Sequence, residues 1–553
     1  MSVPVRRKNI FAEKVMKNGS ISDNNLASTS AQNGLEISSS NQEGILGNVQ
    51  QFVAMPEDLK KLRKKAASST TNIDTQTARN ASRICGSKEA APPKKGYLIF
   101  DASFESGNLG RVDCISEYEF DLFIRPDSCN ARWRLWFYFR VSNCKAKQRV
   151  MFNVVNFSKL KSLFQEGMTP VVRSSATQKS WLRLSPKQVF YNRSASHQDR
   201  FVLSFSYVFE WENEIYEFAY SYPYTNADLQ RHLLSLEVKR LPYFRRELLA
   251  LSLQQRRVDL LTISESKNNT RGANSCANPR HSSGPEKIVF ITSRVHPGES
   301  PASYVCQGIL DFLTDPENSV AHLLRQEFVF KIVPMLNPDG VALGNYRSSL
   351  MGFDLNRHWL SPSPWAHPTI HATKGLLLGY KEDPNAKVVV YIDIHAHSTK
   401  TNAFFFGNVY SRDPGRCEKQ LVLPYLLHEA TADFSMENTQ FNTDPIKAGT
   451  SRRTLGALLD MDCLCYTLEV SFFGFRDTKS LERFSSVQAY VPEKYAEIGA
   501  NLCRALLKYA EILNGTRSLP KIPRPFLQFL PPKETTAASK ENSDMNVPMG
   551  RLL

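Results

Sequence analysis

Five short apolar runs between residues 287 and 473 constrain the fold of this chain more than any other feature. They read "KIVFIT", "FVFKIVPMLN", "KVVVYIDIHAHS", "NAFFFGN" and "CYTLEVSFF". Segments with a helical pattern, such as "SYVCQGILDFLTD" and "LVLPYLLHEATADF", separate them. Strands that alternate with helices predict an α/β domain, in which a mixed sheet has helices on both faces.

A different residue pattern precedes this region. From about Gly96, runs such as "YLIFDASF", "RWRLWFYFRVSN" and "RFVLSFSYVFEW" alternate aromatic or β-branched residues with polar ones. This period of two is typical of antiparallel strands and predicts an all-β sandwich. After it, "ADLQRHLLSLEVKR" and "YFRRELLALSLQQRRVDLLTIS", residues 227–240 and 243–264, have a helical pattern.

These changes of residue pattern divide the 553 residues into two domains and two tails. Residues 1–92 are Ser- and Asn-rich and basic, and predict a disordered tail; its run "LKKLRKK" is either a nuclear-import or polyanion patch or a solvated segment. We expect the β-sandwich over 93–228 and the α/β domain over 229–515, with a polar insertion near 264–286. Residues 516–553 predict a second disordered tail.

The charge and the apolar pattern restrict location and partners. The chain has 69 Lys and Arg against 54 Asp and Glu, and the net charge of +15 points to an acidic partner: nucleic acid, an anionic membrane or an acidic polypeptide. No apolar run is long enough to cross a membrane, and the first residues lack a signal-peptide pattern, so we expect a cytosolic or nuclear protein without membrane insertion. Ten scattered cysteines predict reduced, mostly buried thiols.

Three side chains in the second domain suggest a metal site. His296 and Glu299 stand three residues apart in "HPGES", directly after the first strand, and two His with one Glu are a common zinc ligand set. The third ligand is expected at the carboxyl end of "VVVYIDIHAHS", where α/β sheets place their chemistry. His395 is the candidate; His397 is an alternative ligand or an outer donor, and Asp393 is a candidate partner for a ligand imidazole.

Further along the chain, a base and carboxylate-binding groups are candidates. Glu469 stands alone in an apolar strand, so it is either the base that takes a proton from an attacking water or half of an ion pair with an arginine. Arg347, Asn356 and Arg357 offer donors for a carboxylate, or belong to an ordinary basic loop.

The ordered motifs "HPGES", "NPDG", "GNYR", "GFDLNRHW", "DIHAHS" and "CYTLEVSF" resemble those of the M14 zinc carboxypeptidases. More narrowly, the chain resembles the cytosolic carboxypeptidases, which trim glutamates from tubulin and other proteins. The resemblance covers about residues 240–515 and extends into the β-sandwich. It implies one zinc ion per chain held by His296, Glu299 and His395, and it makes Glu469 the general base. It also implies that Arg347 steadies the developing oxyanion, while Asn356 and Arg357 grip the terminal carboxylate of the substrate.

The chain departs from the digestive relatives in one segment. Those relatives carry a mobile tyrosine about twenty residues before the base, whereas no tyrosine lies between Phe434 and Cys465 here. Instead, Lys447, Arg452 and Arg453 bring positive charge, which favours an acidic outgoing side chain.

We therefore expect a metallocarboxypeptidase that removes glutamates, C-terminal or side-chain-linked, from acidic protein tails. The implied partner is glutamylated tubulin, and the implied location is the cytosol, in association with microtubules, centrosomes or basal bodies. Nucleic acid is not an expected partner, and the chain is expected to be a monomer. Two other hypotheses are a catalytically silent module that binds acidic tails and a zinc enzyme that deacylates a small amino acid. The intact ligands with Glu469 argue against the first, and the Asn356–Arg357 pair with the extra β-domain argues against the second.

Overall fold

The computed structural model of the chain describes residues 42–43, 47–52, 94–175, 180–265, 284–410, 413–480, 486–523 and 526. The basic run at residues 59–65 and most of the polar insertion near 264–286 lie outside the described residues. Among the described helices, none combines the length and the apolar character that a membrane span needs. The cysteines of the described part are free thiols, and most of them are buried.

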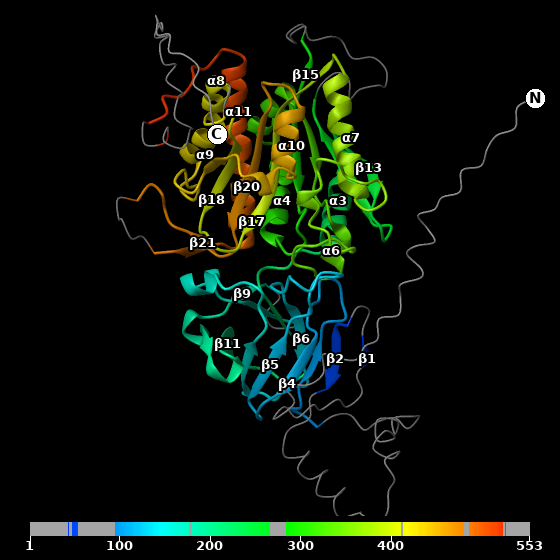
Figure 1. Ribbon diagram of the computed structural model, residues 1–553, viewed down its shortest axis with the longest axis vertical. Coiled ribbons are helices and arrows are strands. Elements are labelled where there is room, and N and C mark those ends of the chain that lie inside the picture. Colours follow the sequence, from blue (N-terminus) through cyan, green and yellow to red (C-terminus); the bar gives the residue numbers. More distant parts are fainter. Residues whose placement is uncertain are drawn as a thin grey trace, which may run out of the picture. The chain divides into compact units, whose positions relative to one another are not determined.

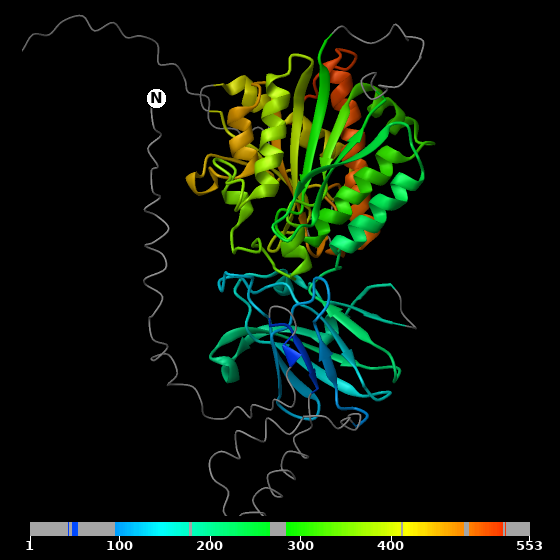
Figure 2. The same cartoon turned by 90° about the vertical axis from the view of Figure 1, so that its right-hand side faces the viewer.

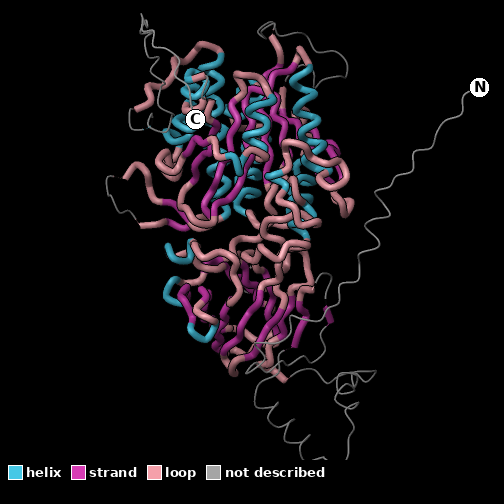
Figure 3. The backbone as a smooth tube through the Cα atoms, in the orientation of Figure 1, coloured by secondary structure: helices cyan, strands magenta, loops and turns pink. Residues whose placement is uncertain are grey.

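The first domain, called the β-domain below, confirms the predicted all-β sandwich (Figure 3). Aromatic rings fill the space between its two sheets: Phe218 of one sheet lies 5.4 Å from Phe152 of the other, measured between ring centroids. One sheet has the order β1 (Gln42–Glu43), β2 (Val49–Phe52), β3 (Ile99–Asp101), β6 (Tyr138–Ser142), β12 (Tyr216–Ala219), β8 (Val171–Ser174) and β9 (Leu182–Arg183). The other has the order β10 (Val189–Ser194), β11 (Arg200–Val208), β7 (Arg149–Val154), β5 (Glu119–Phe123) and β4 (Arg111–Cys114). Three short 3₁₀ helices connect these strands: η1 (Leu163–Glu166), η2 (Pro186–Gln188) and η3 (Ala195–His197).

Part of the segment expected to be tail belongs to this sandwich. Strand β2 pairs with β3, and the preceding Asn48 is buried and donates to Gly107 O at 3.0 Å. The strand is only four residues long and lies in a polar, low-complexity stretch, so the local composition does not predict it. The segment forms a strand because it pairs with β3, which follows about fifty residues later.

The second domain, called the α/β domain, has one eight-stranded mixed sheet (Figure 1). The central strands β16, β15, β17 and β20 are parallel, and antiparallel pairs join β14 to β16 and β18 to β20. Strand bounds, in spatial order, are β13 (Phe244–Leu251), β14 (Arg257–Ile263), β16 (Val329–Val333), β15 (Glu286–Ser293), β17 (Ala386–His397), β20 (Leu464–Ser471), β18 (Ala403–Asn408) and β19 (Gln440–Asn442). A separate hairpin pairs β21 (Gly474–Phe475) with β22 (Gln488–Ala489).

Helices cover both faces of this sheet, as the sequence predicts (Figure 2). Helices α4 (Ser300–Thr314) and α11 (Pro492–Leu513) pack together on one face, whereas α7 (Pro368–Glu382) and α10 (Ser451–Leu458) pack on the other. Alternate residues of β15 serve the two faces: Val289 and Ile291 belong to the core with α4, and Ile288 and Phe290 to the core with α7. The remaining helices are α3 (Asn226–Val238), α5 (Ser319–Glu327), α6 (Pro338–Ala342), η5 (Leu355–Arg357), α8 (Pro414–Lys419), α9 (Val422–Ala430) and η6 (Pro445–Lys447).

The helix predicted over residues 243–264 is wrong, because this segment is the antiparallel hairpin of β13 and β14. Its leucines satisfy a helical spacing, but β14 also pairs with β16 and becomes buried almost throughout. Backbone pairing with the rest of the sheet outweighs the helix propensity of the leucines. The helix predicted over residues 227–240 is present as α3, which begins one residue earlier.

Candidate metal centre and catalytic pocket

The turn between β15 and α4 carries His296 and Glu299. Arg294, at its start, has a left-handed φ of 58° and a buried guanidinium that donates to Pro297 O at 2.8 Å and Ser303 Oγ at 2.7 Å. Gly298 lets the turn approach a neighbouring loop closely, because a Cβ there would lie 2.9 Å from the Cα of Tyr346. The local backbone therefore holds both candidate ligands in one rigid turn.

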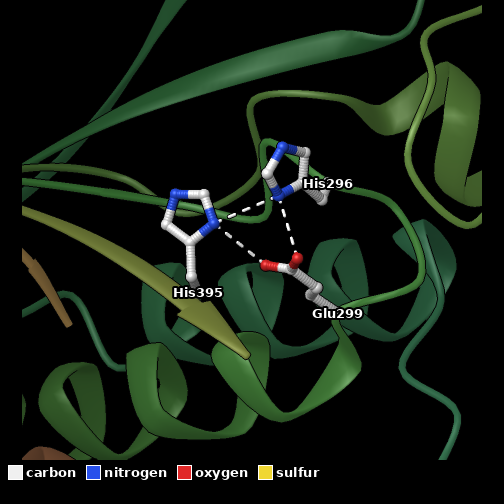
Figure 4. Close-up of side chains that lie close together, drawn as sticks. All are labelled: His296, Glu299 and His395. Carbon is white, nitrogen blue, oxygen red and sulfur yellow. Dashed lines mark hydrogen bonds and ion pairs between the residues drawn. The ribbon is translucent and has the colours of Figure 1, made fainter. Parts of the chain in front are cut away.

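His395 meets this pair from the carboxyl end of β17. Figure 4 shows the three side chains pointing toward one another. His296 Nδ1 lies 2.9 Å from Glu299 Oε1, His395 Nδ1 lies 3.0 Å from Glu299 Oε2, and the two Nδ1 atoms are 3.1 Å apart. All three side chains are buried.

This donor set fits a zinc ion. Tetrahedral zinc with ligand bonds of about 2.0 Å separates its ligand atoms by about 3.3 Å, close to the spacings observed. The Nδ1 atoms of His296 and His395 face each other and the Glu299 carboxylate at hydrogen-bond distance. These atoms offer more lone pairs than there are protons to share among them, and a bound cation would stabilise such a group. No other group of three His, Cys, Asp or Glu with this convergence occurs in the described part of the chain.

Two aspartates orient the ligand imidazoles from behind. Asp393 Oδ2 lies 2.8 Å from His395 Nε2, and Asp354 Oδ1 lies 3.0 Å from His296 Nε2. Although burial raises the pKa of Asp354, His296 and the Arg347 guanidinium at 2.7 Å outweigh it and hold the pKa well below its ordinary value. Sequence reasoning named Asp393 but missed Asp354, although it stands inside the quoted "GFDLNRHW". Such carboxylates fix the tautomer and orientation of a ligand imidazole.

Glu469 lies on β20, directly beside His395 in the parallel register of β17 and β20. It lines the same pocket as the three candidate ligands. Burial, together with the nearby charge of Glu299, raises the pKa of Glu469 to about 7 against the opposing effect of His395. In the described part of the chain no arginine forms an ion pair with it, so the structural alternative left open by the sequence lacks its partner. A carboxyl with such a pKa is suited to accept and return a proton near neutral pH.

Arg347, Asn356 and Arg357 line this pocket, whose volume is about 430 Å³. Arg347 Nε donates to Asp354. Asn356 Oδ1 accepts from the Ser451 N–H at 2.9 Å, and Arg357 Nη1 donates to Asn356 O at 2.8 Å. The structure therefore brings the predicted carboxylate donors together with the metal ligands.

His397 does not join the ligand cluster. Its Nδ1 accepts from the Lys400 N–H at 3.1 Å, and its ring packs on Phe404 with centroids 5.4 Å apart. Burial, reinforced by Lys400 and Lys159, lowers the pKa of His397 to about 4. It is therefore a neutral member of the pocket wall.

The three basic residues proposed for side-chain recognition have different surroundings. Lys447 lines the pocket and lies 4.9 Å from the centre of the Phe406 ring. Arg452 also lines the pocket but is buried and donates to Gly407 O and to Asn408 Oδ1. Arg453 donates to Asn442 O at 3.1 Å and is not among the pocket residues. Of the three, Lys447 is the one with an ammonium free to meet a ligand in the pocket.

The β-domain completes the pocket, a contribution that sequence reasoning missed. Both domains lie in one compact unit. Lys159, Leu160 and Lys161, between β7 and η1, line the pocket, and Lys159 Nζ donates to Tyr346 Oη at 2.7 Å. Asp127, between β5 and β6, accepts the backbone N–H groups of residues 346, 347 and 348 at 2.6 to 2.8 Å. No local sequence pattern connects these residues to a loop two hundred positions away.

Two family models match the chain. One is described as zinc carboxypeptidase and matches residues 244–442; the other is described as cytosolic carboxypeptidase N-terminal domain and matches residues 100–221. The first match falls within the α/β domain of the structure, and the second falls within the β-domain.

Curated relatives and solved structures agree with these models. The chain is 52% identical to human Cytosolic carboxypeptidase 6 over 79% of its own length and 83% of the relative's, and 49% identical to that of Caenorhabditis elegans over 81% and 95%. It shares the fold of a metallo-carboxypeptidase from Burkholderia cenocepacia, with a TM-score of 0.61, 21% identity and coverage of 75% of this chain and 99% of that one. A Pseudomonas aeruginosa metallo-carboxypeptidase gives a TM-score of 0.59 at 24% identity, covering 76% of this chain and 100% of that one.

The site on this fold defines a metallocarboxypeptidase. The chain belongs to the zinc carboxypeptidase family, within its cytosolic carboxypeptidase branch. The family resemblance drawn from the motifs is thereby confirmed.

Proposed function

We propose that this metallocarboxypeptidase releases glutamate from glutamylated or otherwise acidic protein tails, with glutamylated tubulin as a substrate, and that it works with one zinc ion per chain in the cytosol. The observation that carries the proposal is the charge of the pocket. Two carboxylates line it: Glu299 belongs to the metal centre, and Glu469 lies beside His395 on the neighbouring strand. Six cationic side chains line it as well: Lys159, Lys161, Arg347, Arg357, Lys447 and Arg452.

The positive charge exceeds what carboxypeptidase chemistry alone requires. One cation suffices to hold the terminal carboxylate, and another suffices for the scissile carbonyl oxygen. Lys447 remains on the wall beside Phe406, where the side chain of the outgoing residue would lie. A glutamate side chain pairs with this ammonium, whereas an apolar side chain would strip water from it without replacement.

The catalytic roles follow from the positions of the side chains. His296, Glu299 and His395 would hold the zinc ion, which would supply Lewis-acid polarisation and lower the pKa of a water molecule. Glu469 accepts the proton of the attacking water and delivers it to the leaving amine, which its raised pKa permits. Arg347, held by Asp354, donates to the carbonyl oxygen as charge develops there. Asn356 and Arg357 position the terminal carboxylate.

A silent module that binds acidic tails would use the same charged pocket, but it would have no use for a half-buried carboxyl such as that of Glu469 beside the metal ligands. The three candidate ligands are present, and Asp354 and Asp393 lie within hydrogen-bond distance of the two ligand histidines. Glu469 is paired with His395 in the register of β17 and β20. Together these groups favour an enzyme over a module that only binds acidic tails.

The test is incubation of the purified chain with glutamylated tubulin, with and without a zinc chelator, with the products read by mass spectrometry. Loss of glutamate residues that requires zinc is expected. A Glu469→Gln variant is the matched control, because it keeps the pocket's shape. Unchanged tubulin, together with cleavage of Glu- and Leu-terminated peptides at equal rates, would contradict the proposal.

A further inference from the structure

A β-domain segment, residues 159–161, forms part of the wall of the catalytic pocket. Its two lysines are the pocket's cations that come from outside the α/β domain. Lys159 Nζ donates to Tyr346 Oη at 2.7 Å and to Ser398 Oγ at 2.9 Å, which are neutral groups. Lys161 is exposed, and among the described residues neither lysine forms an ion pair with a carboxylate.

The position of Lys159 relative to Arg347 defines the side of the pocket on which it lies. Its Nζ is 5.9 Å from the centre of the Trp133 ring, and Arg347 Cζ lies 5.3 Å from that centre. Tyr346, which holds the ammonium, is the chain neighbour of Arg347. Lys159 and Arg347 therefore lie around the same ring, that of Trp133. Asn356, Arg357 and Lys447, by contrast, come from η5 and η6, and the segments that directly follow these two helices are joined by the hydrogen bond from Trp359 N to Gly449 O.

This arrangement separates two charged regions along the substrate. Arg347 steadies the oxygen of the scissile carbonyl, and that carbonyl belongs to the residue that precedes the released one. The region of Lys447 and Arg357 receives the released residue, so the region of Lys159 faces the chain that remains. We propose that Lys159 and Lys161 form a subsite for an acidic side chain immediately before the scissile bond. The proposal rests on the proposed function, because it extends the same acidic selectivity by one position.

The chemistry of lysine suits such a subsite. An ammonium on a flexible stem meets carboxylates in more than one position, whereas an arginine fork demands one planar geometry. In a chain of glutamates, the residue before each scissile bond is itself a glutamate. Its carboxylate would replace the hydroxyl acceptors of Lys159 by a charged one, and charge-assisted hydrogen bonds are the stronger. Because the site is partly open to water, we expect a preference of roughly 5- to 30-fold for a penultimate glutamate over glutamine.

The experiment uses the full chain and peptides that end in glutamate and differ at the penultimate residue: Glu, Gln or Lys. The ratio of kcat/KM for penultimate Glu over Gln is measured for the parent and for Lys159→Met and Lys161→Glu. Both substitutions should lower the ratio toward one, and Lys161→Glu should increase cleavage of the penultimate-Lys peptide. Lys187→Glu is the matched control, because Lys187 is exposed on the same domain and does not line the pocket, so its ratio should equal the parent's.

The outcomes separate this inference from the proposed function. A parent ratio near one, or a ratio that neither substitution changes, overturns the subsite. Terminal selectivity is measured in parallel on peptides with penultimate Gln that end in Glu or Leu. A strong preference for terminal Glu there, with no penultimate preference, removes the subsite alone. Equal cleavage of those two peptides removes the proposed function instead. A general slowing of all peptides, from altered support of Tyr346, cancels in each ratio and so does not imitate the expected result.

Discussion

Asp127 offers a sharp test of how the β-domain supports catalysis. Its side chain is 3% exposed and accepts three consecutive backbone N–H groups of the loop that carries Arg347. Burial raises the pKa of Asp127, and the three N–H groups oppose that effect. Asparagine keeps one oxygen and places an NH₂ where the second oxygen was. At least one backbone N–H then faces a donor instead of an acceptor.

The cost can be estimated from these contacts. A hydrogen bond to a charged group contributes about 1.5 to 3 kcal/mol, and an unsatisfied buried donor costs about 1 to 3 kcal/mol. We therefore expect Asp127→Asn to cost about 2 to 4 kcal/mol in total, shared between global stability and displacement of the loop. If the loop shifts by about 1 Å, kcat should fall roughly 100-fold. KM should change less, because Asn356 and Arg357 stand on another segment.

The assay is the determination of kcat and KM on a Glu-terminated peptide, together with urea unfolding and zinc analysis. Asp199→Asn is the matched control, since Asp199 is an exposed β-domain aspartate with a left-handed φ that asparagine also accepts. It should leave all three measurements unchanged. If Asp127→Asn retains kcat within twofold and stability within about 0.5 kcal/mol, the cross-domain support of Arg347 is refuted.

The remaining predictions concern the metal and the pocket. His395→Ala should lose zinc in metal analysis while His397→Ala retains it; equal retention would remove His395 from the ligand set. A chelator should lower the unfolding temperature of the parent, since zinc binds the folded state alone, and no shift would speak against a bound ion. Glu469→Gln should keep zinc and peptide binding but lose roughly 100- to 10,000-fold in kcat, and substantial residual turnover would give Glu469 a structural role. Lys447→Met should reduce the kcat/KM ratio of Glu- over Leu-terminated peptides by roughly 5- to 150-fold, whereas Arg453→Met should not; the reverse order would move the acidic selectivity to Arg453.

The parts of the fold that sequence predicts are those with a local signal. Alternating aromatics gave the sandwich, and apolar runs between helical segments gave the mixed sheet. The hairpin at residues 244–263 was misread because the leucines fit both periods, and the sheet that decides between them forms with β16, some seventy residues later. Local propensity is a weak guide where such long-range pairing is available.

The same distinction separates the site residues. His296, Glu299 and His395 stand at strand ends within short motifs, and the structure brings them together. Asp127 and Lys159 have no comparable motif. Their relation to the pocket depends on how the two domains pack against each other. Neither the hydrophobic periodicity nor the composition of the sequence predicts that packing.

The docking of the β-domain also has a consequence for biosynthesis. The chain leaves the ribosome from its N-terminus, and domains generally fold in that order. Asp127 precedes residues 346–348 by some two hundred positions, so the carboxylate that accepts their three N–H groups is synthesised well before they are. A β-domain that folds first would present this acceptor to the loop of Arg347 as the loop is synthesised, so assembly of the pocket would follow the order of synthesis.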